Sequence, residues 1–374
     1  MWFKNALIFT PSGPFSGSFA VEGGRFREIC AGTCPAQEAV DLHGARVIPG
    51  LVDIHTHGNS GADFSDGDPA GLERMGRYLA RQGITAFTPT SMTLPYEALS
   101  RAFAAARALH DQRPEGCARV MGIHMEGPFL SPRRKGAQNG DYLKLPDPAG
   151  FSALQQGCGG LIRIVDVAAE LTGAASFAVW ASRSCTVSAA HTDADYDQAA
   201  QLFAAGARHL THLFNAMPPI HHRAPGLIGA ASEREEVTAE LICDGLHVHP
   251  SAVRMAFRLF PGRICLISDA LRCCGMEEGE YELAGQRVYL RHGEARLADG
   301  TLAGSVCNLF ACLRNAIAFG IPAPEAVAAA TAIPARVIGA QEDIGAIAPG
   351  LRADFVVCNE GWNRLAVYLD GTAL

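Results

Sequence analysis

Several apolar segments of the sequence end in a histidine or an acidic residue, and both side-chain types can bind metal and move protons. Imidazole nitrogens and carboxylate oxygens are common ligands of zinc and related divalent ions. A carboxylate beside such an ion can also act as a general acid or base. In chain order, the residues concerned are His55, His57, Glu126, His191, His212 and Asp269.

Each of these residues has an ordinary structural explanation when it is taken alone. His-x-His pairs occur on many strands, Glu126 precedes Gly-Pro and could lie in a solvated turn, and Asp269 could cap a helix. The joint pattern is much harder to obtain by chance, because five segment ends supply four histidines, one glutamate and one aspartate. The pattern therefore favours a metal site with an acid/base carboxylate beside it.

The segments that must position these residues alternate between strand-like and helix-like patterns. Such alternation favours a parallel sheet, and eight strand–helix units indicate a (β/α)8 TIM-like barrel. In that fold the C-terminal ends of the strands converge on one mouth, where the chemistry lies. The eight expected strands are residues 51–57, 84–91, 118–126, 161–170, 185–193, 209–216, 237–247 and 263–270.

Amphipathic or alanine-rich stretches between and after the strands predict helices. A stretch of hairpins, residues 276–304, is expected as an insertion after the eighth strand. The expected helices are residues 69–83, 96–112, 195–207, 249–260, 305–320 and 323–339.

Both ends of the chain differ from the middle. Residues 1–48 contain short alternating strands with glycine-rich turns, and the last 30 or so residues look similar. We therefore expect one small β-sandwich domain formed from both termini, residues 1–50 and 335–374, around a barrel of residues 51–334.

Composition excludes several classes of protein. The chain has 374 residues, of which 48% are hydrophobic and 18% charged, so a large core is possible and disorder is not expected. A net charge of -7 argues against a general nucleic-acid binder. No run reaches the ~18 apolar residues of a membrane span.

Cysteine usage and the N-terminal residues bear on location. The 12 cysteines are scattered without paired C-x-x-C motifs, which disfavours a zinc–thiolate cage. The first residues, "MWFKNALIFTPSG", lack the apolar region and cleavage site of a signal peptide. These patterns favour a soluble cytoplasmic protein with reduced thiols.

A second set of polar residues follows the sixth and seventh strands. The segment "THLFNAMPPIHHRAPG" supplies Asn215, Ala216 and Arg223, and "CDGLHVHP" supplies His247. The arginine and the histidine could bind an anion. In contrast, the run Arg133–Lys135 is expected to be a solvated loop face.

Taken together, the motifs resemble those of N-acetylglucosamine-6-phosphate deacetylases of the amidohydrolase superfamily. The matching stretches are "PGLVDIHTHG", "GIHMEGPFLSPRRKGA", "THLFNAM", "RAPG", "CDGLHVHP", "ISDA" and "DGTLAGS". The resemblance covers nearly the whole chain. The EGP and THLFNAM motifs are specific to the family, whereas the His-x-His motif indicates only the superfamily.

The resemblance implies a metal centre with one or two divalent ions per chain. Glu126, His191 and His212 would bind the main metal, and His55 and His57 would bind a second one with Glu126 as a bridge. Zinc is the first expectation, and iron, manganese and cobalt also suit this ligand set. Asp269 would be the general base and acid.

The resemblance also implies a site for an amino-sugar phosphate. Family members are usually homodimers, and the arginine that binds the phosphate can come from the neighbouring subunit. Asn215, Ala216, Arg223 and His247 would hold the sugar phosphate, Ala137 and Gln138 would contact the sugar, and Thr301, Leu302 and Ala303 would close over the acetyl group.

One position departs from the family pattern. After "KGA" the family usually has a histidine that polarises the amide carbonyl or holds the sugar, and this chain has Gln138. Glutamine can donate a hydrogen bond but carries no charge. The substitution leaves open a preference for a related sugar, such as the galactosamine epimer.

The expected reaction is hydrolysis of N-acetylglucosamine 6-phosphate to glucosamine 6-phosphate and acetate. A cyclic-amide amidohydrolase is an alternative, but many of these use a carboxylated lysine at the end of strand four, and residues 161–170 contain no lysine. A ligand-binding barrel without catalysis is a third alternative, which the presence of Asp269 disfavours.

Overall fold

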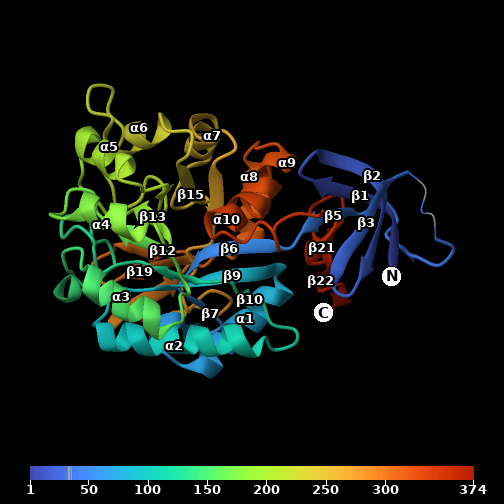
Figure 1. Ribbon diagram of the computed structural model, residues 1–374, viewed down its shortest axis with the longest axis horizontal. Coiled ribbons are helices and arrows are strands. Elements are labelled where there is room, and N and C mark those ends of the chain that lie inside the picture. Colours follow the sequence, from blue (N-terminus) through green and yellow to red (C-terminus); the bar gives the residue numbers. More distant parts are fainter. Residues whose placement is uncertain (33, 35) are drawn as a thin grey trace.

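A barrel formed by the middle of the chain lies beside a sheet formed by the two ends. The computed structural model describes residues 1–32, 34 and 36–374. Both termini lie in the terminal sheet, at the end of the molecule away from helices α3–α6 (Figure 1). The fold therefore separates a large body that can hold a site from a small one that closes the chain.

The barrel consists of parallel strands in the order β6-β9-β11-β12-β13-β14-β15-β16, with the short β10 also beside β9. The ring closes where Asp269 donates its N–H to the carbonyl of His55, at 2.9 Å, and where Thr56 bridges Ala270. The expected (β/α)8 barrel is confirmed. Its strands are β6 (Leu51–Thr56), β9 (Ile84–Ser91), β10 (Arg119–Val120), β11 (Ile123–Met125), β12 (Ile162–Val167), β13 (Thr186–Ala189), β14 (His209–Leu210), β15 (Thr238–Ile242) and β16 (Ile264–Ile267).

The barrel strands are buried on both faces, as expected for a parallel sheet covered by helices. Every residue of β6, β9 and β16 is buried. Continuous burial explains why these segments are apolar along their length. It also makes each polar residue inside them notable, because a buried polar group requires a partner.

Helices cover the outside of the barrel, and local capping sets where several begin. Asp68 accepts the N–H groups of Ala70 and Gly71 at the start of α1, and Asp195 and Gln198 form a capping box on α5. The helices are α1 (Pro69–Arg81), α2 (Tyr96–Gln112), α3 (Pro148–Gly157), α4 (Ala174–Ala181), α5 (Tyr196–Ala204), α6 (Gly226–Ser232), α7 (Pro250–Leu259), α8 (Leu309–Ala318), α9 (Ala323–Ala329) and α10 (Ala332–Val337), with 3-10 turns η1 (Phe64–Asp66) and η2 (Gly140–Tyr142).

The prediction of a single helix over residues 323–339 is wrong, because the structure has two helices, α9 and α10, in that range. The chain breaks at Thr331, whose φ of -138° and ψ of -81° are not helical. Pro334 supplies the reason. It has no N–H to donate to Ala330, and its ring would collide with that carbonyl in a continuous helix.

The expected hairpin insertion after the eighth strand is present and folds over the barrel mouth. Its last strand leads to Ser305, which bridges Ala270 next to Asp269. Gln286 of the insertion also donates to the carbonyl of Ala137 at 2.6 Å. The strands are β17 (Gly279–Leu283), β18 (Gln286–Arg291), β19 (Glu294–Leu297) and β20 (Leu302–Gly304), and a small two-stranded sheet near the mouth has β7 (Gly58–Asn59) and β8 (Ala62–Asp63).

The terminal sheet joins both ends of the chain, as expected, in the order β23-β22-β21-β5-β1-β2-β3, with β4 also beside β1. Its core is aromatic: Phe3 stacks on Phe19 at 4.8 Å between ring centroids, and Phe355 on Tyr368 at 4.3 Å. The division at residues 50 and 335 stays a prediction. The strands are β1 (Trp2–Thr10), β2 (Gly13–Glu22), β3 (Arg25–Ala31), β4 (Val40–Asp41), β5 (Arg46–Pro49), β21 (Phe355–Cys358), β22 (Arg364–Leu369) and β23 (Thr372–Ala373).

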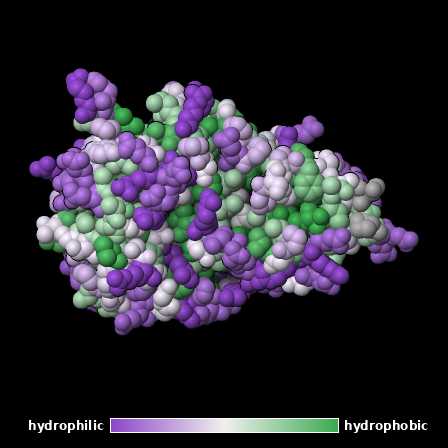
Figure 2. Space-filling model, turned by 45° about the horizontal axis from the view of Figure 1, so that its top comes forward, coloured by the Kyte–Doolittle hydropathy of each residue, from purple (hydrophilic) through white to green (hydrophobic). Residues whose placement is uncertain are grey.

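The surface is consistent with this division of the molecule. Hydrophilic side chains dominate the barrel face that is turned to the viewer, and hydrophobic ones are more frequent toward the terminal sheet (Figure 2).

Within the part of the chain that the structure describes, no helix combines the length and the apolar character needed to cross a membrane.

Candidate metal centre

Four histidine side chains and one glutamate converge at the barrel mouth, as the sequence predicted. Glu126 follows β11, and its Oε1 lies 3.2 Å from Nε2 of His191 and 3.1 Å from Nε2 of His212. The other oxygen, Oε2, lies 3.3 Å from Nε2 of His57, and Nε2 of His55 is 3.6 Å from Oε1. Glu126 therefore lies between two pairs of imidazoles.

The arrangement has the composition and spacing of a metal centre. Two groups of three residues each present one ligand atom within 4.8 Å of the others: Glu126 with His191 and His212, and Glu126 with His55 and His57. Within each pair the Nε2 atoms face one another, at 3.0 Å for His191 and His212 and 3.4 Å for His55 and His57. Two neutral imidazoles would oppose lone pairs there, and a divalent cation between them would satisfy both.

Hydrogen bonds to the opposite ring nitrogens orient three of the four histidines. Nδ1 of His55 lies 2.8 Å from Oε2 of Glu240, Nδ1 of His57 lies 3.1 Å from the carbonyl of Thr90, and Nδ1 of His191 lies 2.8 Å from the carbonyl of Arg134. An acceptor at Nδ1 places the proton there and leaves the Nε2 lone pair for a metal. The hydrogen bonds of these three histidines therefore favour the tautomer that can bind a metal through Nε2.

The backbone turns sharply at three of the site residues. His191, His212 and Asp269 have φ angles of 41°, 31° and 47°, in the left-handed region that few residues other than glycine adopt. Each of them lies two residues beyond the end of a barrel strand. Such local strain is concentrated at functional sites, where the surrounding structure holds it in place.

Asp269 stands beside the second pair of histidines. Its Oδ1 lies 3.2 Å from Nε2 of His57 and 3.4 Å from Nε2 of His55, and the side chain remains slightly exposed. Burial raises the pKa of Asp269, but His55 and His57 outweigh that effect and hold the pKa below its usual value. The carboxylate is therefore ionised at neutral pH, as a general base must be.

The ligand residues also have perturbed pKa values. Burial raises the pKa of Glu126, but the surrounding histidines hold it well below the usual range. For His212, burial lowers the pKa, whereas Glu126 and other carboxylates raise it to about 9. Binding of a metal at these ligands would therefore release protons from imidazole.

Gln138 is buried against the metal ligands. Its Nε2 donates to Oε2 of Glu126 at 2.6 Å, and its Oε1 accepts the backbone N–H of Thr93 at 2.7 Å. Both polar atoms of the amide are thus engaged within the protein. The loop that precedes Gln138 is held to the mouth by Arg133 and Arg134, which both pair with Asp193. Because the two arginines already have a carboxylate partner, they fit the expected loop face and not a phosphate clamp.

The residues expected to hold a phosphate lie on two loops. Arg223 is exposed, and its Nη1 lies 2.6 Å from Nε2 of His222. His247 is oriented by Asp244, whose Oδ2 lies 2.6 Å from Nδ1, which leaves Nε2 available. Within the part of the chain that the structure describes, neither side chain forms a hydrogen bond or ion pair with a metal ligand.

The remaining predicted sugar-site residues are half-buried or buried around the mouth. Asn215 donates to the carbonyls of His212 and Leu213, each at 3.3 Å, which ties its loop to a metal ligand. Ala216 has a φ of 52°. Ala137 lies in the loop beside Gln138, and Thr301, Leu302 and Ala303 lie at and just before the edge strand β20 of the insertion.

Sequence reasoning missed a layer of buried polar residues beneath the ligands. A signal for it exists, since Glu240 interrupts the apolar run "VTAELIC" and Asp166 interrupts "IRIVDVA". Both residues are fully buried in strands, where a carboxylate needs partners. The members of this layer are His124, Asp166, His209 and Glu240.

Comparisons with known proteins agree with the site. The model of the amidohydrolase family matches residues 46–374. An N-acetylglucosamine-6-phosphate deacetylase from Bacillus subtilis is 41% identical over 269 residues, which cover 70% of this chain and 67% of the relative. An N-acetylgalactosamine-6-phosphate deacetylase from Escherichia coli O157:H7 is 33% identical over 329 residues, 87% of this chain and 86% of the relative.

A solved structure shares the whole fold. It is a variant of N-acetyl-D-glucosamine-6-phosphate deacetylase from Mycobacterium smegmatis in complex with N-acetyl-D-glucosamine-6-phosphate, with a TM-score of 0.94 and 33% identity. The match covers 100% of this chain and 98% of that one. The chain belongs to the amidohydrolase family and, within it, to the N-acetylglucosamine-6-phosphate deacetylase family, as the sequence motifs indicated.

Proposed function

We propose that this protein hydrolyses the N-acetyl group of N-acetylglucosamine 6-phosphate, giving glucosamine 6-phosphate and acetate. The single observation that carries the proposal is the meeting of Glu126, His191 and His212 at the barrel mouth with Asp269 beside them. A site of this composition supports metal-assisted hydrolysis of an amide. The relatives that are N-acetylglucosamine-6-phosphate deacetylases supply the substrate class.

The protein residues have separable roles in this reaction. A divalent metal, when bound, lowers the pKa of water and polarises a carbonyl oxygen. Asp269 takes a proton from the attacking water and later returns it to the leaving amine. His55 and His57 lie beside that carboxylate, with Nε2 3.4 Å and 3.2 Å from its Oδ1, and so help to position it.

The number and identity of the metals belong to the proposal. The first metal would be held by Glu126, His191 and His212, and the second by His55 and His57 with Glu126 as a shared ligand. Zinc suits the imidazole and carboxylate donors, and iron, manganese or cobalt would also be accommodated. The proposal is for one or two divalent ions per chain, and the second group of ligands supports two.

Loops at the mouth would bind the sugar phosphate. Arg223 and His247 offer donors for a phosphate, and charge-assisted bonds of this kind fix a small flexible sugar. Arg223 is exposed. In a homodimer it would bind the phosphate of a substrate held by the neighbouring subunit. A cytoplasmic location fits a phosphorylated metabolite. The other proposed substrate contacts are Ala137, Gln138, Asn215, Ala216, Thr301, Leu302 and Ala303.

The galactosamine epimer is a second candidate substrate. It is favoured by the similarity to the Escherichia coli N-acetylgalactosamine-6-phosphate deacetylase and by Gln138, which stands where the family usually has histidine. The Gln138 amide contacts Glu126 and Thr93, so Gln138 would also influence the substrate through the metal ligand Glu126.

A substrate panel tests the proposed function. Acetate release would be measured with N-acetylglucosamine 6-phosphate, N-acetylgalactosamine 6-phosphate and unphosphorylated N-acetylglucosamine. We expect the first to have the highest kcat/KM. A higher value for the galactosamine epimer would move the assignment to that sugar, and absence of acetate release from all three would refute a deacetylase.

A further inference from the structure

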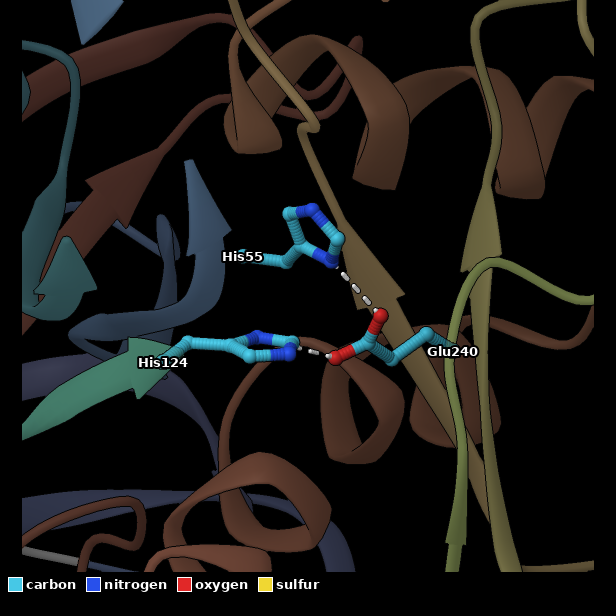
Figure 3. Close-up of side chains that lie close together, drawn as sticks. All are labelled: His55, His124 and Glu240. Atoms are coloured by element: carbon cyan, nitrogen blue, oxygen red, sulfur yellow. Dashed lines mark hydrogen bonds and ion pairs between the residues drawn. The ribbon is translucent and has the colours of Figure 1, made fainter. Parts of the chain in front are cut away.

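The buried polar layer under the metal centre is formed by strands on opposite sides of the barrel. His124 lies on β11 and Glu240 on β15, and both are fully buried. In Figure 3 the rings of His55 and His124 approach different oxygens of Glu240. His209 of β14 approaches the same carboxylate, with Nε2 3.2 Å from Oε1. Glu240 is thus the centre of this layer.

Glu240 contacts one residue of each proposed metal group. Its Oε2 lies 2.8 Å from Nδ1 of His55 and accepts the backbone N–H of His212 at 3.2 Å. The two contacts differ in kind, because the first holds an imidazole ring and the second holds only main chain. Loss of the carboxylate should therefore disturb His55 far more than His212.

His55, His124 and Glu240 have the composition of a third metal group. The hydrogen bonds argue for a supporting role instead. Both ring nitrogens of His124 are already engaged, Nδ1 with the carbonyl of Ile54 and Nε2 with Oδ1 of Asp166, each at 3.0 Å. Nδ1 of His124 is 3.8 Å from Glu240, longer than a hydrogen bond.

We propose that Glu240 is the positioning residue of the second metal site, acting through His55. The inference rests on the proposed function, because it assumes a metal at the mouth. The carboxylate fixes the proton of His55 on Nδ1 and the ring plane with it, so that Nε2 faces Glu126 and Asp269. A carboxylate in this place also makes the imidazole a stronger ligand. Without Glu240, the His55 ring loses the buried carboxylate that orients it.

Metal content provides a test that does not depend on activity. Wild type, Glu240→Gln and Glu240→Leu would be equilibrated with zinc at set free concentrations and analysed for metal per chain. We expect two equivalents in wild type. In Glu240→Gln the affinity for one equivalent should fall about 10- to 100-fold, with the other nearly unchanged. Glu240→Leu, which offers no acceptor, should lose that equivalent.

The matched control is Asp354→Asn, which makes the same carboxylate-to-amide change at a buried position by the terminal sheet. It should keep both equivalents. A second comparison uses His55→Ala: if Glu240 acts through His55, adding Glu240→Gln to that variant should not lower metal affinity further. Because Gln has nearly the shape of Glu, that variant remains informative if Glu240→Leu fails to fold.

Three results would overturn the inference. These are unchanged metal affinity in Glu240→Gln, additive losses in the double variant, and a wild-type protein that holds one equivalent only. The outcomes are distinct from failure of the proposed function, which would appear as absence of acetate release in wild type with both metals bound.

Discussion

The two ends of the barrel arrange their charged and titratable groups in different ways. At the end next to the terminal sheet, Arg119 pairs with Asp354 and Asp370, and Arg352 pairs with Asp370 at 3.0 Å and with Asp343 at 2.7 Å. Every one of these groups faces an opposite charge. At the mouth, imidazole nitrogens face one another as closely as 3.0 Å.

The difference shows what each end is for. The arginine–aspartate network is complete in itself and ties the barrel to the terminal sheet, so its contribution is to stability. The mouth places imidazole Nε2 atoms against one another and around Glu126 and Asp269, which suits a bound cation. Its strained backbone adds a cost that the rest of the fold must offset. In barrels of this kind, the C-terminal ends of the strands generally carry the function, and the opposite end contributes to stability.

Removing Glu126 should give the largest effect, because it belongs to both of the proposed metal groups. We expect Glu126→Ala to lose both metals and all measurable deacetylase activity. Elemental analysis and acetate release from the same preparation would check this. Retained metal together with activity would contradict the assignment of the mouth as the metal centre.

Asp269→Asn should separate chemistry from binding at the mouth. We expect kcat to fall at least ~100-fold, as for loss of a general acid or base, with metal content and substrate binding largely kept. In contrast, an aspartate that only capped a helix would tolerate asparagine well. Near-normal turnover would place the proton transfer on another residue.

Arg223→Ala tests whether the exposed arginine reads the phosphate. We expect kcat/KM for the phosphorylated substrate to fall about 10- to 100-fold, as for a lost charged hydrogen bond, with little effect on free N-acetylglucosamine. Equal losses on both substrates would make Arg223 structural. Subunit exchange with Glu126→Ala should restore activity if the arginine acts across a dimer.

Gln138→His should have a modest effect on rate. Histidine brings a charged donor but must replace the contacts of the glutamine amide with Glu126 and Thr93. We expect kcat/KM to change by about five-fold, the equivalent of ~1 kcal/mol, with a change in the ratio between the glucosamine and galactosamine epimers. If both values and their ratio stay the same, Gln138 has no part in catalysis.

Asp354→Asn should show the smallest effect on activity and a clear effect on stability. Asp354 is buried beside Arg119, so the substitution leaves a half-buried guanidinium with a weaker partner. We expect the free energy of unfolding to fall by about 1–3 kcal/mol, from the denaturant midpoint, with kcat unchanged. A loss of metal in this variant would mean that the two ends are coupled.

The sequence was sufficient for the barrel and for the residues that meet at its mouth. The strand periodicity and the polar residue at each strand end are local patterns, and the barrel topology brings them together. Pro334 was also visible in the sequence as a reason to divide the last predicted helix. Short helices such as α4 and α6 were missed because their small, largely apolar segments have little amphipathic pattern.

Contacts between distant segments were beyond the sequence. The Gln138 side chain meets Glu126 and Thr93 only because its loop folds back over the mouth. Likewise, an acidic residue inside an apolar strand marks Glu240 as unusual, but its partner His55 lies 185 residues away in the chain. Periodicity predicts which face a residue takes and cannot predict the partner across the barrel.

Metal depletion and reconstitution test the central claim most directly. The protein would be stripped by a chelator, and acetate release from N-acetylglucosamine 6-phosphate would be followed as zinc, iron, manganese or cobalt is added back. We expect no activity in the stripped protein and a return of activity that saturates at two equivalents of metal per chain. Full activity in protein shown to be free of metal would contradict it.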